Sequence, residues 1–207
     1  EVKKNKSELL QKFRFTDYPK RYWFFLAIIF VFTLGNSTDA LLLVKANEAG
    51  IKVAFIPLVY LITSLVSVIA AIPAGTLSDR IGKEKLLVAG FLIYAVVYLF
   101  FGLNVGEGAL FVLFALYGLY SAATDGIQKA FVADVTDANK KGTALGIYNA
   151  LLGITLLPAS LIAGILYDRV NSSIPFLFGA AMALLATIMM AVYMITGRKQ
   201  PAKGSRG

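Results

Sequence analysis

The chain has 207 residues, of which 58% are hydrophobic and only 15% are charged, and its net charge is +8. A soluble domain of this size would have too few polar residues to cover its surface, so the composition indicates a membrane protein. Cysteine and histidine are both absent from the sequence. Disulfides, imidazole–thiolate metal sites and nucleophiles activated by histidine are therefore excluded in this chain. The basic residues gather in particular segments, so the positive charge requires no nucleic-acid partner.

Residues 1–21 precede the first long apolar run and are rich in Lys and Arg. They lack the apolar core and cleavage site of a signal peptide, and a full-length spanning segment follows them directly. We interpret them as a cytoplasmic basic linker that lies on anionic lipid headgroups, with a disordered tail as the alternative. Because residue 1 is Glu rather than Met, we expect the numbered chain to be a piece of a longer protein. The basic residues of the linker are Lys3, Lys4, Lys6, Lys12, Arg14, Lys20 and Arg21.

Six apolar runs are long enough, or nearly so, to cross a bilayer core, which takes about 20 residues of helix. They predict an all-α, polytopic membrane protein in which residues 22–197 form a single six-helix bundle and residues 198–207 form a cytoplasmic tail. No connection between the runs is long enough to hold a separate domain. The predicted spans are 22–44, 51–74, 86–104, 109–133, 143–167 and 174–196.

The distribution of Lys and Arg predicts the orientation of the bundle. Of the 20 basic residues, 17 fall in the two terminal segments and in the connections on the same side of the membrane. The other three are Lys45, Lys52 and Arg169. Cytoplasmic segments carry the excess of Lys and Arg, so both termini are predicted to be cytoplasmic. The membrane is predicted to be the plasma membrane.

A charged segment bracketed by glycines, residues 75–85, separates the second and third predicted spans. A connection this short forces the flanking helices to run antiparallel. Gly75 and Gly82 would allow close backbone approach and positive φ angles. We expect Asp79 to lie where a helix ends or restarts, as an N-cap or as a partner of a neighbouring base. The candidate bases are Arg80, Lys83 and Lys85.

The pattern Gly75-x-Leu77-x-Asp79-Arg80-x-Gly82-Lys83 resembles the loop signature of the major facilitator superfamily. In that family the loop joins the second and third helices of a six-helix half and acts as a cytoplasmic gate latch. Glu84 departs from the family pattern, which has a second basic residue at this position. The resemblance implies that Gly75, Leu77, Asp79, Arg80, Gly82 and Lys83 form a gating motif.

The chain also repeats itself. The pattern Ala74-Gly75-x-Leu77-x-Asp79-Arg80 recurs 89 residues later, from Ala163 to Arg169. A Thr-Asp dipeptide also precedes each copy, Thr38-Asp39 before the first and Thr124-Asp125 before the second. Each unit would contain three helices, and three is an odd number, so the second unit enters the membrane from the opposite side. The sequence therefore predicts two inverted three-helix repeats, a plan shared by many secondary carriers.

Acidic residues within spans are costly in lipid and usually face protein or water. Asp39 lies about 17 residues into the first predicted span, roughly 26 Å along a helix. With Asn36 it belongs to a polar break in an otherwise apolar segment, which we interpret as the lining of a substrate or proton path. A polar cap near the helix end is the alternative.

Asp125 lies similarly deep in the fourth predicted span, and Lys129 follows at i+4, where the two side chains can pair. Either they form a pair that changes between conformations, or they form a static pair near the membrane rim with Lys129 extended to the surface. Tyr148 and Asn149 on the fifth span are candidate ligand contacts, although Asn149 could instead bond across helices. Gly142 and Gly146 have the spacing that lets helices pack closely. Gly153, Pro158 and Gly164 are loosely similar to an antiporter signature, which favours export.

We therefore expect the C-terminal half of a facilitator-type secondary transporter, which alternates in access against an N-terminal half. Its partners would be membrane lipid, that half, a small-molecule substrate and protons, coupled through Asp39 or Asp125. No organic cofactor is expected. Two alternatives stay open: a six-helix carrier working as a homodimer, and a membrane scaffold that transports nothing. An intramembrane serine enzyme is disfavoured, because Ser37 and Ser121 have no histidine base and no Gly-x-Ser-x-Gly turn is present.

Overall fold

The computed structural model describes residues 18–36, 39–103 and 105–197, and every regular element in these ranges is helical. The all-α prediction is confirmed. Most of the predicted basic linker and the whole predicted tail lie outside the described residues. The helices are α1 Lys20–Gly35, α2 Asp39–Glu48, α3 Ile56–Ile81, α4 Lys83–Gly102, α5 Glu107–Asp134, α6 Lys141–Arg169 and α7 Ile174–Gly197, with short 3-10 turns at Val53–Phe55 and Ala138–Lys140.

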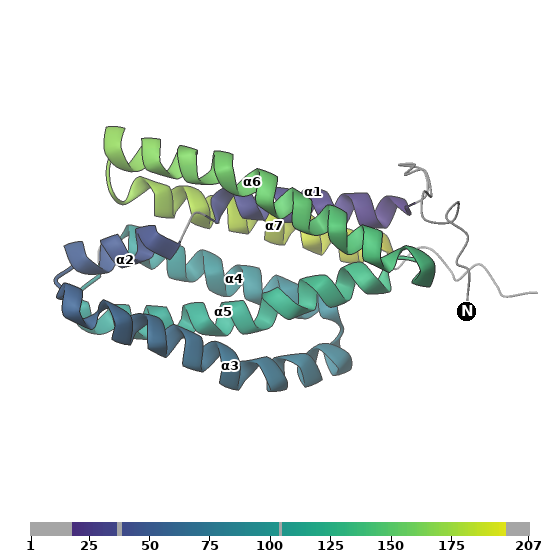
Figure 1. The fold of residues 1–207 in the computed structure, drawn as a ribbon, viewed down its shortest axis with the longest axis horizontal. Helices are drawn as coiled ribbons and strands as arrows, with labels where there is room; N and C mark the ends of the chain where they lie inside the picture. The colour runs from purple at the N-terminus through teal and green to yellow at the C-terminus, as the bar shows by residue number, and fades with distance from the viewer. Residues whose placement is uncertain (1–17, 37–38, 104, 198–207) are drawn as a thin grey trace, which may run out of the picture.

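Five of the described helices, α3 to α7, are long and apolar enough to cross a membrane. They correspond to the second to sixth predicted spans. The first predicted span is wrong as one continuous helix, because residues 22–44 are divided between α1, which has 16 residues, and α2, which has 10. Both pieces lie along the same bundle, as Figure 1 shows.

The end of α1 is fixed by the polar run that the sequence contains there. Gly35 is a poor helix former, and the Asn36 that follows leaves the helical conformation, with φ −91° and ψ 81°. The Asn36 N–H donates to the carbonyls of Phe32 and Thr33, at 3.1 Å each, which closes the last turn of α1. The break therefore lies between apolar segments, in the middle of the predicted span.

The connection between α3 and α4 is much shorter than the predicted turn over residues 75–85. Helix α3 continues to Ile81 and α4 begins at Lys83, so Gly82 alone interrupts them. Its φ of +97° is accessible to glycine without steric cost, and its N–H closes α3 by donating to the Ser78 carbonyl at 2.9 Å. The expectation that Asp79 is an N-cap is wrong, because it lies in the last turn of α3. Gly75 lies within α3, and a Cβ added to it would meet no atom within 4 Å, so it makes no close approach within the described part of this chain.

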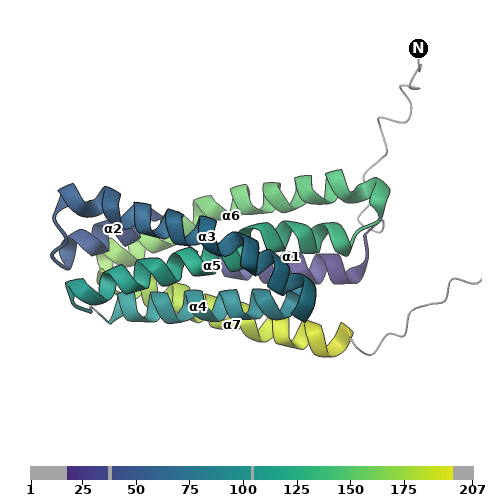
Figure 2. The ribbon, with the colours of Figure 1, turned by 90° about the horizontal axis from the view of Figure 1, so that it is seen from below.

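The helices run along the long axis of the molecule (Figures 1 and 2). Helix α3 packs mainly against α5, whereas α6 packs against α1. Helix α4 contacts α5, α7 contacts α1, and α4 and α7 contact each other. Exchanging the first three-helix unit (α1–α2, α3, α4) with the second (α5, α6, α7) leaves this pattern of neighbours unchanged, as inverted repeats require.

Small residues bring the helices together at the centre of the bundle. A Cβ on Gly118 of α5 would lie 2.4 Å from the Thr63 carbonyl oxygen of α3, and the Thr63 hydroxyl donates to the Phe114 carbonyl at 3.2 Å. Between α1 and α7, a Cβ on Gly179 would lie 2.6 Å from the Gly35 carbonyl oxygen. These contacts join helices of different units, so the two units form one core.

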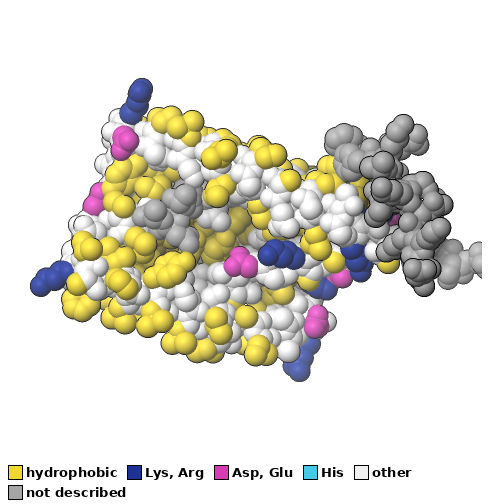
Figure 3. Space-filling view, in the orientation of Figure 1, with side chains coloured by type: hydrophobic (Ala, Val, Ile, Leu, Met, Phe, Trp, Pro, Cys, Tyr) yellow, Lys and Arg dark blue, Asp and Glu magenta, His cyan; other side chains and the backbone are white. Residues whose placement is uncertain are grey.

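Helices α3 and α6 lie at the edge of the bundle. In the most apolar stretches of these two helices only 11% and 17% of residues are buried, against 44% to 56% in α4, α5 and α7. Large exposed side chains such as Ile72 on α3 and Leu157 on α6 form this surface. Figure 3 shows a mainly apolar face with most charged side chains toward the two ends. Lipid or further apolar helices would cover such a surface.

Candidate functional site

Polar side chains from four helices surround an open pocket in the middle of the bundle. Its two adjoining parts have volumes of about 440 and 400 Å³ and share Asn36, Tyr120 and Asp125. We call the two parts together the central pocket. Its lining comes from α1 and the residue that follows it (Phe32, Thr33, Asn36), α3 (Tyr60, Thr63, Ser64, Ser67, Val68), α5 (Tyr117, Tyr120, Ser121, Asp125, Gln128) and α6 (Tyr148, Leu152, Gly153, Leu156). Both three-helix units therefore contribute to it.

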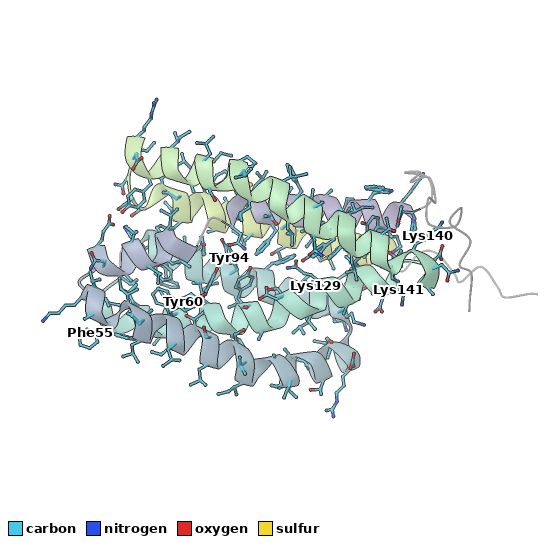
Figure 4. All side chains as sticks on the ribbon, viewed as in Figure 1. Phe55, Tyr60, Tyr94, Lys129, Lys140 and Lys141 are labelled. Atoms are coloured by element: carbon cyan, nitrogen blue, oxygen red, sulfur yellow. The ribbon has the colours of Figure 1, made fainter. Side chains whose placement is uncertain are left out.

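Asn36 is held at the broken end of α1 by two tyrosines. Its Nδ2 donates to the Tyr120 hydroxyl at 3.2 Å, and its Oδ1 accepts from the Tyr94 hydroxyl at 3.4 Å. Tyr94 is fully buried, and its hydroxyl also donates to the Gly35 carbonyl at 3.0 Å, a group that the end of the helix leaves without an intrahelical partner. Figure 4 labels Tyr94 near the centre of the bundle. These bonds fix the amide of Asn36 at the pocket wall.

Asp125 lies where the two parts of the central pocket meet. Its carboxylate accepts from the Ser121 hydroxyl at 2.5 Å and from the Thr124 hydroxyl at 3.5 Å. Lys129 is one turn away and exposed, yet within the described chain no ion pair joins it to Asp125. The predicted i,i+4 pair is therefore not formed. Figure 4 shows Lys129 in the space between α5 and α6.

The two candidates on α6 differ in their surroundings. Tyr148 is buried, and its hydroxyl donates to Gln128 Oε1 of α5 at 2.7 Å, so it forms part of the pocket wall. The side chain of Asn149 is exposed and forms no hydrogen bond with the other described residues. It lies on one face of α6 with Gly142, Gly146 and Gly153, spaced at intervals of three and four residues. A Cβ at any of these three glycines would meet no atom within 4 Å, so the close packing predicted for Gly142 and Gly146 does not occur within the described part of this chain.

The last candidate, Asp39, is the first residue of α2. Its side chain lies outside the described part of the structure. The backbone places it three residues beyond Asn36, at the far side of the break in the first predicted span.

The gating-motif residues lie together at one end of the bundle, which we call the motif end. Asp79, Gly82 and Lys83 line a second pocket of about 390 Å³. Asp79, Arg80 and Leu77 are exposed, and among the described residues Asp79 forms no ion pair. The expected pairing of Asp79 with a neighbouring base is therefore not formed.

Lys83 binds the end of another helix instead. Its Nζ lies 2.5 Å from Asp134 Oδ2, at the C-terminus of α5. Beside this pair, Arg21 of α1 lies 4.0 Å from Glu84 of α4. The guanidinium of Arg21 also lies 4.8 Å from the centre of the Tyr193 ring on α7. Charged contacts thus connect α1, α4, α5 and α7 at the motif end.

The opposite end holds a cluster that the sequence did not single out. Lys45 of α2 is only 4% exposed, and its Nζ donates to the Ser172 hydroxyl at 2.9 Å and lies 3.5 Å from Glu48 Oε2. The Tyr167 hydroxyl of α6 donates to Glu48 Oε1. Burial alone would raise the pKa of Glu48, but hydrogen bonds from Tyr167 and Ser172 and the charge of Lys45 outweigh it and lower that pKa below 4.5. We call Lys45, Glu48, Tyr167, Ser172 and Ser173 the Lys45 cluster.

Several pocket residues were also missed from the sequence, among them Tyr60, Tyr120 and Gln128. A signal for those on α5 was present, because Tyr117, Ser121, Asp125 and Gln128 recur at intervals of three and four residues along one face. For Tyr60 no comparable signal exists, since a lone tyrosine near a helix start resembles an interfacial anchor. The structure thus adds aromatic walls to the polar path predicted from Asn36 and Asp125.

Comparison with known proteins adds independent information. Residues 23–207 match the Major Facilitator Superfamily. An uncharacterised transporter of this superfamily type from Methanocaldococcus jannaschii is 35% identical over 178 residues, which are 83% of this chain and 44% of that protein. Multidrug resistance protein 1 of Bacillus subtilis is 31% identical over 76% of this chain and 39% of its own length. Quinolone resistance protein NorA of Staphylococcus aureus is 24% identical over 63% of this chain and 33% of its own length.

Each match thus spans less than half of the relative's length. The matched region nevertheless includes all the described helices except the first residues of α1. Together with the helical bundle and its five membrane-length helices, this match identifies an integral membrane protein. The chain belongs to the Major Facilitator Superfamily.

Proposed function

We propose that this chain is the C-terminal half of a secondary transporter that moves a small solute across the membrane by alternating access. The observation that carries the proposal is the central pocket, which lies at mid-bundle and is lined by both polar and apolar side chains from four helices of a largely apolar molecule. Transporters of this kind bind their solute near the middle of the bilayer, where their repeats meet. The proposed activity is transport rather than catalysis.

The proposed partner is an N-terminal six-helix half of the same transporter. Two observations support it: the matches span less than half of each relative, and the Gly142, Gly146 and Gly153 face of α6 has no neighbour in the described part of this chain. Small residues on a helix surface allow a second helix to approach closely in lipid. Asn149 on that face would then reach the second half or the solute.

Protons are the proposed coupling ion, with Asp125 as the site. Its carboxylate lies in the central pocket and is not neutralised by Lys129, so protonation would change the charge of the pocket directly. Asp39 is the second candidate, since it follows the same break that presents Asn36. Export is the proposed direction, supported by the names of the Bacillus subtilis and Staphylococcus aureus resistance proteins reported above.

At the motif end, we propose that Gly75, Leu77, Asp79, Arg80, Gly82 and Lys83 form a latch against the neighbouring half. The charged pocket around Asp79 and the Lys83–Asp134 pair support this role, because they join helices of both units where closure would occur. We place this end in the cytoplasm and the protein in the plasma membrane. Figure 4 shows Lys140 and Lys141 at one end of the bundle and Phe55 at the other, in keeping with a basic cytoplasmic end.

The full-length protein in liposomes tests the proposal. A pH gradient should drive solute movement, and Asp125→Asn should abolish it while leaving counterflow without a gradient. Asp168→Asn, an exposed acid at the end of α6, is the matched control and should retain gradient-driven transport. Full gradient-driven transport by Asp125→Asn would remove the coupling role. Absence of counterflow in the wild-type protein for every solute tried would favour a non-transporting scaffold.

A further inference from the structure

The Lys45 cluster has no part in the proposed function, although its polar groups are closely matched. The three N–H groups of the Lys45 ammonium have Ser172 Oγ at 2.9 Å, Ser173 Oγ at 3.4 Å and Glu48 Oε2 at 3.5 Å as partners. Glu48 also accepts a hydrogen bond from Tyr167. The cluster therefore joins α2, in the first three-helix unit, to the end of α6 and the connection that follows it, in the second.

A buried cation is a costly means of holding two helices together. Desolvation of an ammonium group cancels much of what its contacts contribute, and apolar side chains of similar volume often stabilise such a site equally well. Lys45 is 4% exposed, whereas 40% of the Glu48 side chain remains exposed. Opening the contact would return Lys45 to water, which offsets the contacts that are lost. The cluster is therefore suited to forming and breaking.

Helix α2 is attached to the bundle in a way that allows it to separate from α6. Among its described side chains only Leu42, Lys45 and Ala46 are buried, and their spacing of three and four residues forms one narrow face. The preceding helix ends at Gly35, whose carbonyl accepts from Tyr94. Because the helical hydrogen bonds of α1 stop there, α2 can move without carrying α1 with it.

Helix α6 is joined to other helices at three levels by tyrosine hydroxyls. At the motif end Tyr22 of α1 donates to the Ala144 carbonyl at 2.9 Å, and at mid-bundle Tyr148 donates to α5 at 2.7 Å. At the opposite end Tyr167 donates to Glu48. The first two bonds are buried, whereas the third is exposed to solvent. The opposite end of α6 is thus the end that can be released most readily.

The motif end has a matching contact between the same two units. There Lys83 of α4 pairs with Asp134 of α5, beside the pocket that contains Asp79. This pair and the Lys45 cluster connect the two units at opposite ends of the bundle, and the central pocket lies between them. Alternating access opens one end of such a site at a time. Contacts at the two ends are therefore expected to break in turn.

We propose that the Lys45 cluster is a clasp that holds the opposite end of the bundle closed and separates when the central pocket becomes accessible from that end. Tyr167 and Ser172 then move away from Glu48 together with the end of α6. This inference rests on the proposed function in taking alternating access between the two ends. It adds a second conformational contact, made by residues outside the gating motif.

Cysteine labelling at the two ends tests the clasp, because the chain contains no cysteine. The full-length protein is used, with any cysteine outside this chain replaced by serine. Tyr60→Cys reports on the central pocket toward the opposite end, since Tyr60 lines the pocket near the start of α3. Figure 4 shows it on the side of the bundle toward Phe55. Val135→Cys reports on the motif end. The rate of reaction of each with a water-soluble maleimide is measured in detergent.

Lys45→Met removes the charge and keeps a flexible side chain. It should raise the labelling rate of Tyr60→Cys by about threefold and lower that of Val135→Cys by about twofold, because a population gained by one state is lost by the other. Lys52→Met, at an exposed base of the same end, is the matched control and should change neither rate. Higher rates at both reporters would overturn the clasp, since they indicate general loosening of the bundle. Unchanged rates in Lys45→Met would overturn it as well.

Lys83→Met should change the two rates in the opposite sense, since it removes the pair at the motif end. Combining it with Lys45→Met should return both rates toward the wild-type values, as two contacts that bias one equilibrium require. A double variant with the same rates as Lys45→Met alone would contradict the inference.

Tyr167→Phe provides a milder test that keeps every charge and the ring. It removes the exposed hydrogen bond to Glu48 and should raise labelling of Tyr60→Cys by about twofold, with a fall at Val135→Cys. This variant decides the matter if Lys45→Met does not fold, and unchanged rates in it would then overturn the clasp.

The proposed function can fail separately. If the two rates shift in opposite directions but liposomes show neither gradient-driven transport nor counterflow, the transport proposal fails and the clasp stands. If the wild-type protein transports its solute and Lys45→Met leaves both labelling rates unchanged, the clasp fails and the transport proposal stands.

Discussion

The ends of α3 and α6 carry the same sequence pattern but are used differently. In both helices Asp-Arg lies in the last turn, at residues 79–80 and 168–169, and in both copies these two side chains are exposed. In each copy, the residue four positions after the Asp contacts the end of a helix from the other unit. Lys83 there binds Asp134, and Ser172 binds Lys45 and Glu48.

The acids in these contacts also occupy equivalent positions. Asp134 follows Asp125 by nine residues, and Glu48 follows Asp39 by nine residues. At the motif end the cation comes from across the units, and the pair is partly solvated, with 23% of Lys83 and 55% of Asp134 exposed. At the opposite end the cation, Lys45, comes from the same helix as Glu48 and is buried. The repeat has thus preserved positions while the chemistry at them has diverged.

The largest expected effect comes from reversing the charge of Lys45, compared with the same change at Lys83. Lys45→Glu would place a second carboxylate beside Glu48 in a buried site and should lower the free energy of unfolding by about 3 kcal/mol. Lys83→Glu faces Asp134 in a more solvated site and should cost about 1 kcal/mol or less. Thermal unfolding of the full-length protein in detergent measures both. Lys52→Glu, an exposed base at the opposite end, is the control, and equal losses for Lys45→Glu and Lys83→Glu would contradict the comparison.

The two glycines of the gating motif, Gly82 and Gly75, should respond differently to substitution by alanine. Gly82→Ala forces a Cβ into a φ of +97° and should cost about 1 to 2 kcal/mol. Gly75→Ala, within α3 and with open space around it, should instead stabilise the described bundle by about 0.5 to 1 kcal/mol. The same thermal measurement compares them. A destabilising Gly75→Ala in the full-length protein would show that a neighbour outside the described residues approaches Gly75.

The two aspartates of the repeated pattern should differ in their effect on conformation. Asp79 shares a charged pocket with Arg21 and Lys83, so Asp79→Asn should alter labelling of a cysteine placed at Val135 in that pocket by about two- to threefold. Asp168→Asn should leave the labelling rate unchanged. The chain itself contains no cysteine, which simplifies the experiment. Equal rates for Asp79→Asn and the unmodified background would count against the latch.

The smallest expected effect is on the stability of the protein at low pH. Because the folded-state pKa of Glu48 lies below its ordinary value of 4.5, its contribution to stability is complete above that value and is lost as the pH falls through the folded pKa. Glu48→Gln should therefore reduce the fall in melting temperature between about pH 7 and about pH 4. Asp137→Asn, in the connection before α6, is the control. An identical fall in the wild-type protein and Glu48→Gln would exclude this contribution.

Much of the helical framework could be predicted because apolar length is a local property. The five longest helices follow directly from it, and the inverted packing follows from the repeated Asp-Arg pattern. The single-residue junction at Gly82 could not be predicted, since glycines and charges over residues 75–85 are equally compatible with a turn. The break after Gly35 was visible as a polar run, but its backbone conformation depends on Tyr94, which is distant in sequence.

The site was predictable to a similar degree. Asn36, Asp125 and Tyr148 do reach one pocket, since polar residues in apolar helices have few other places to lie. The absence of an Asp125–Lys129 pair in the described structure depends on Ser121, which competes for the carboxylate from one turn earlier. The burial of Lys45 depends on serines more than 120 residues away, which no local pattern reveals.

The crossed packing of α3 and α6 has a consequence for biogenesis. Each of these helices finds its main neighbour in the other unit, α5 for α3 and α1 for α6. As ribosomal synthesis proceeds from the N-terminus, α3 would enter the bilayer with the hydroxyls of Thr63 and Ser67 still facing lipid. They acquire Phe114 and Ser121 as partners only after α5 has been inserted. The first three-helix unit therefore completes its packing only after its inverted counterpart has been inserted.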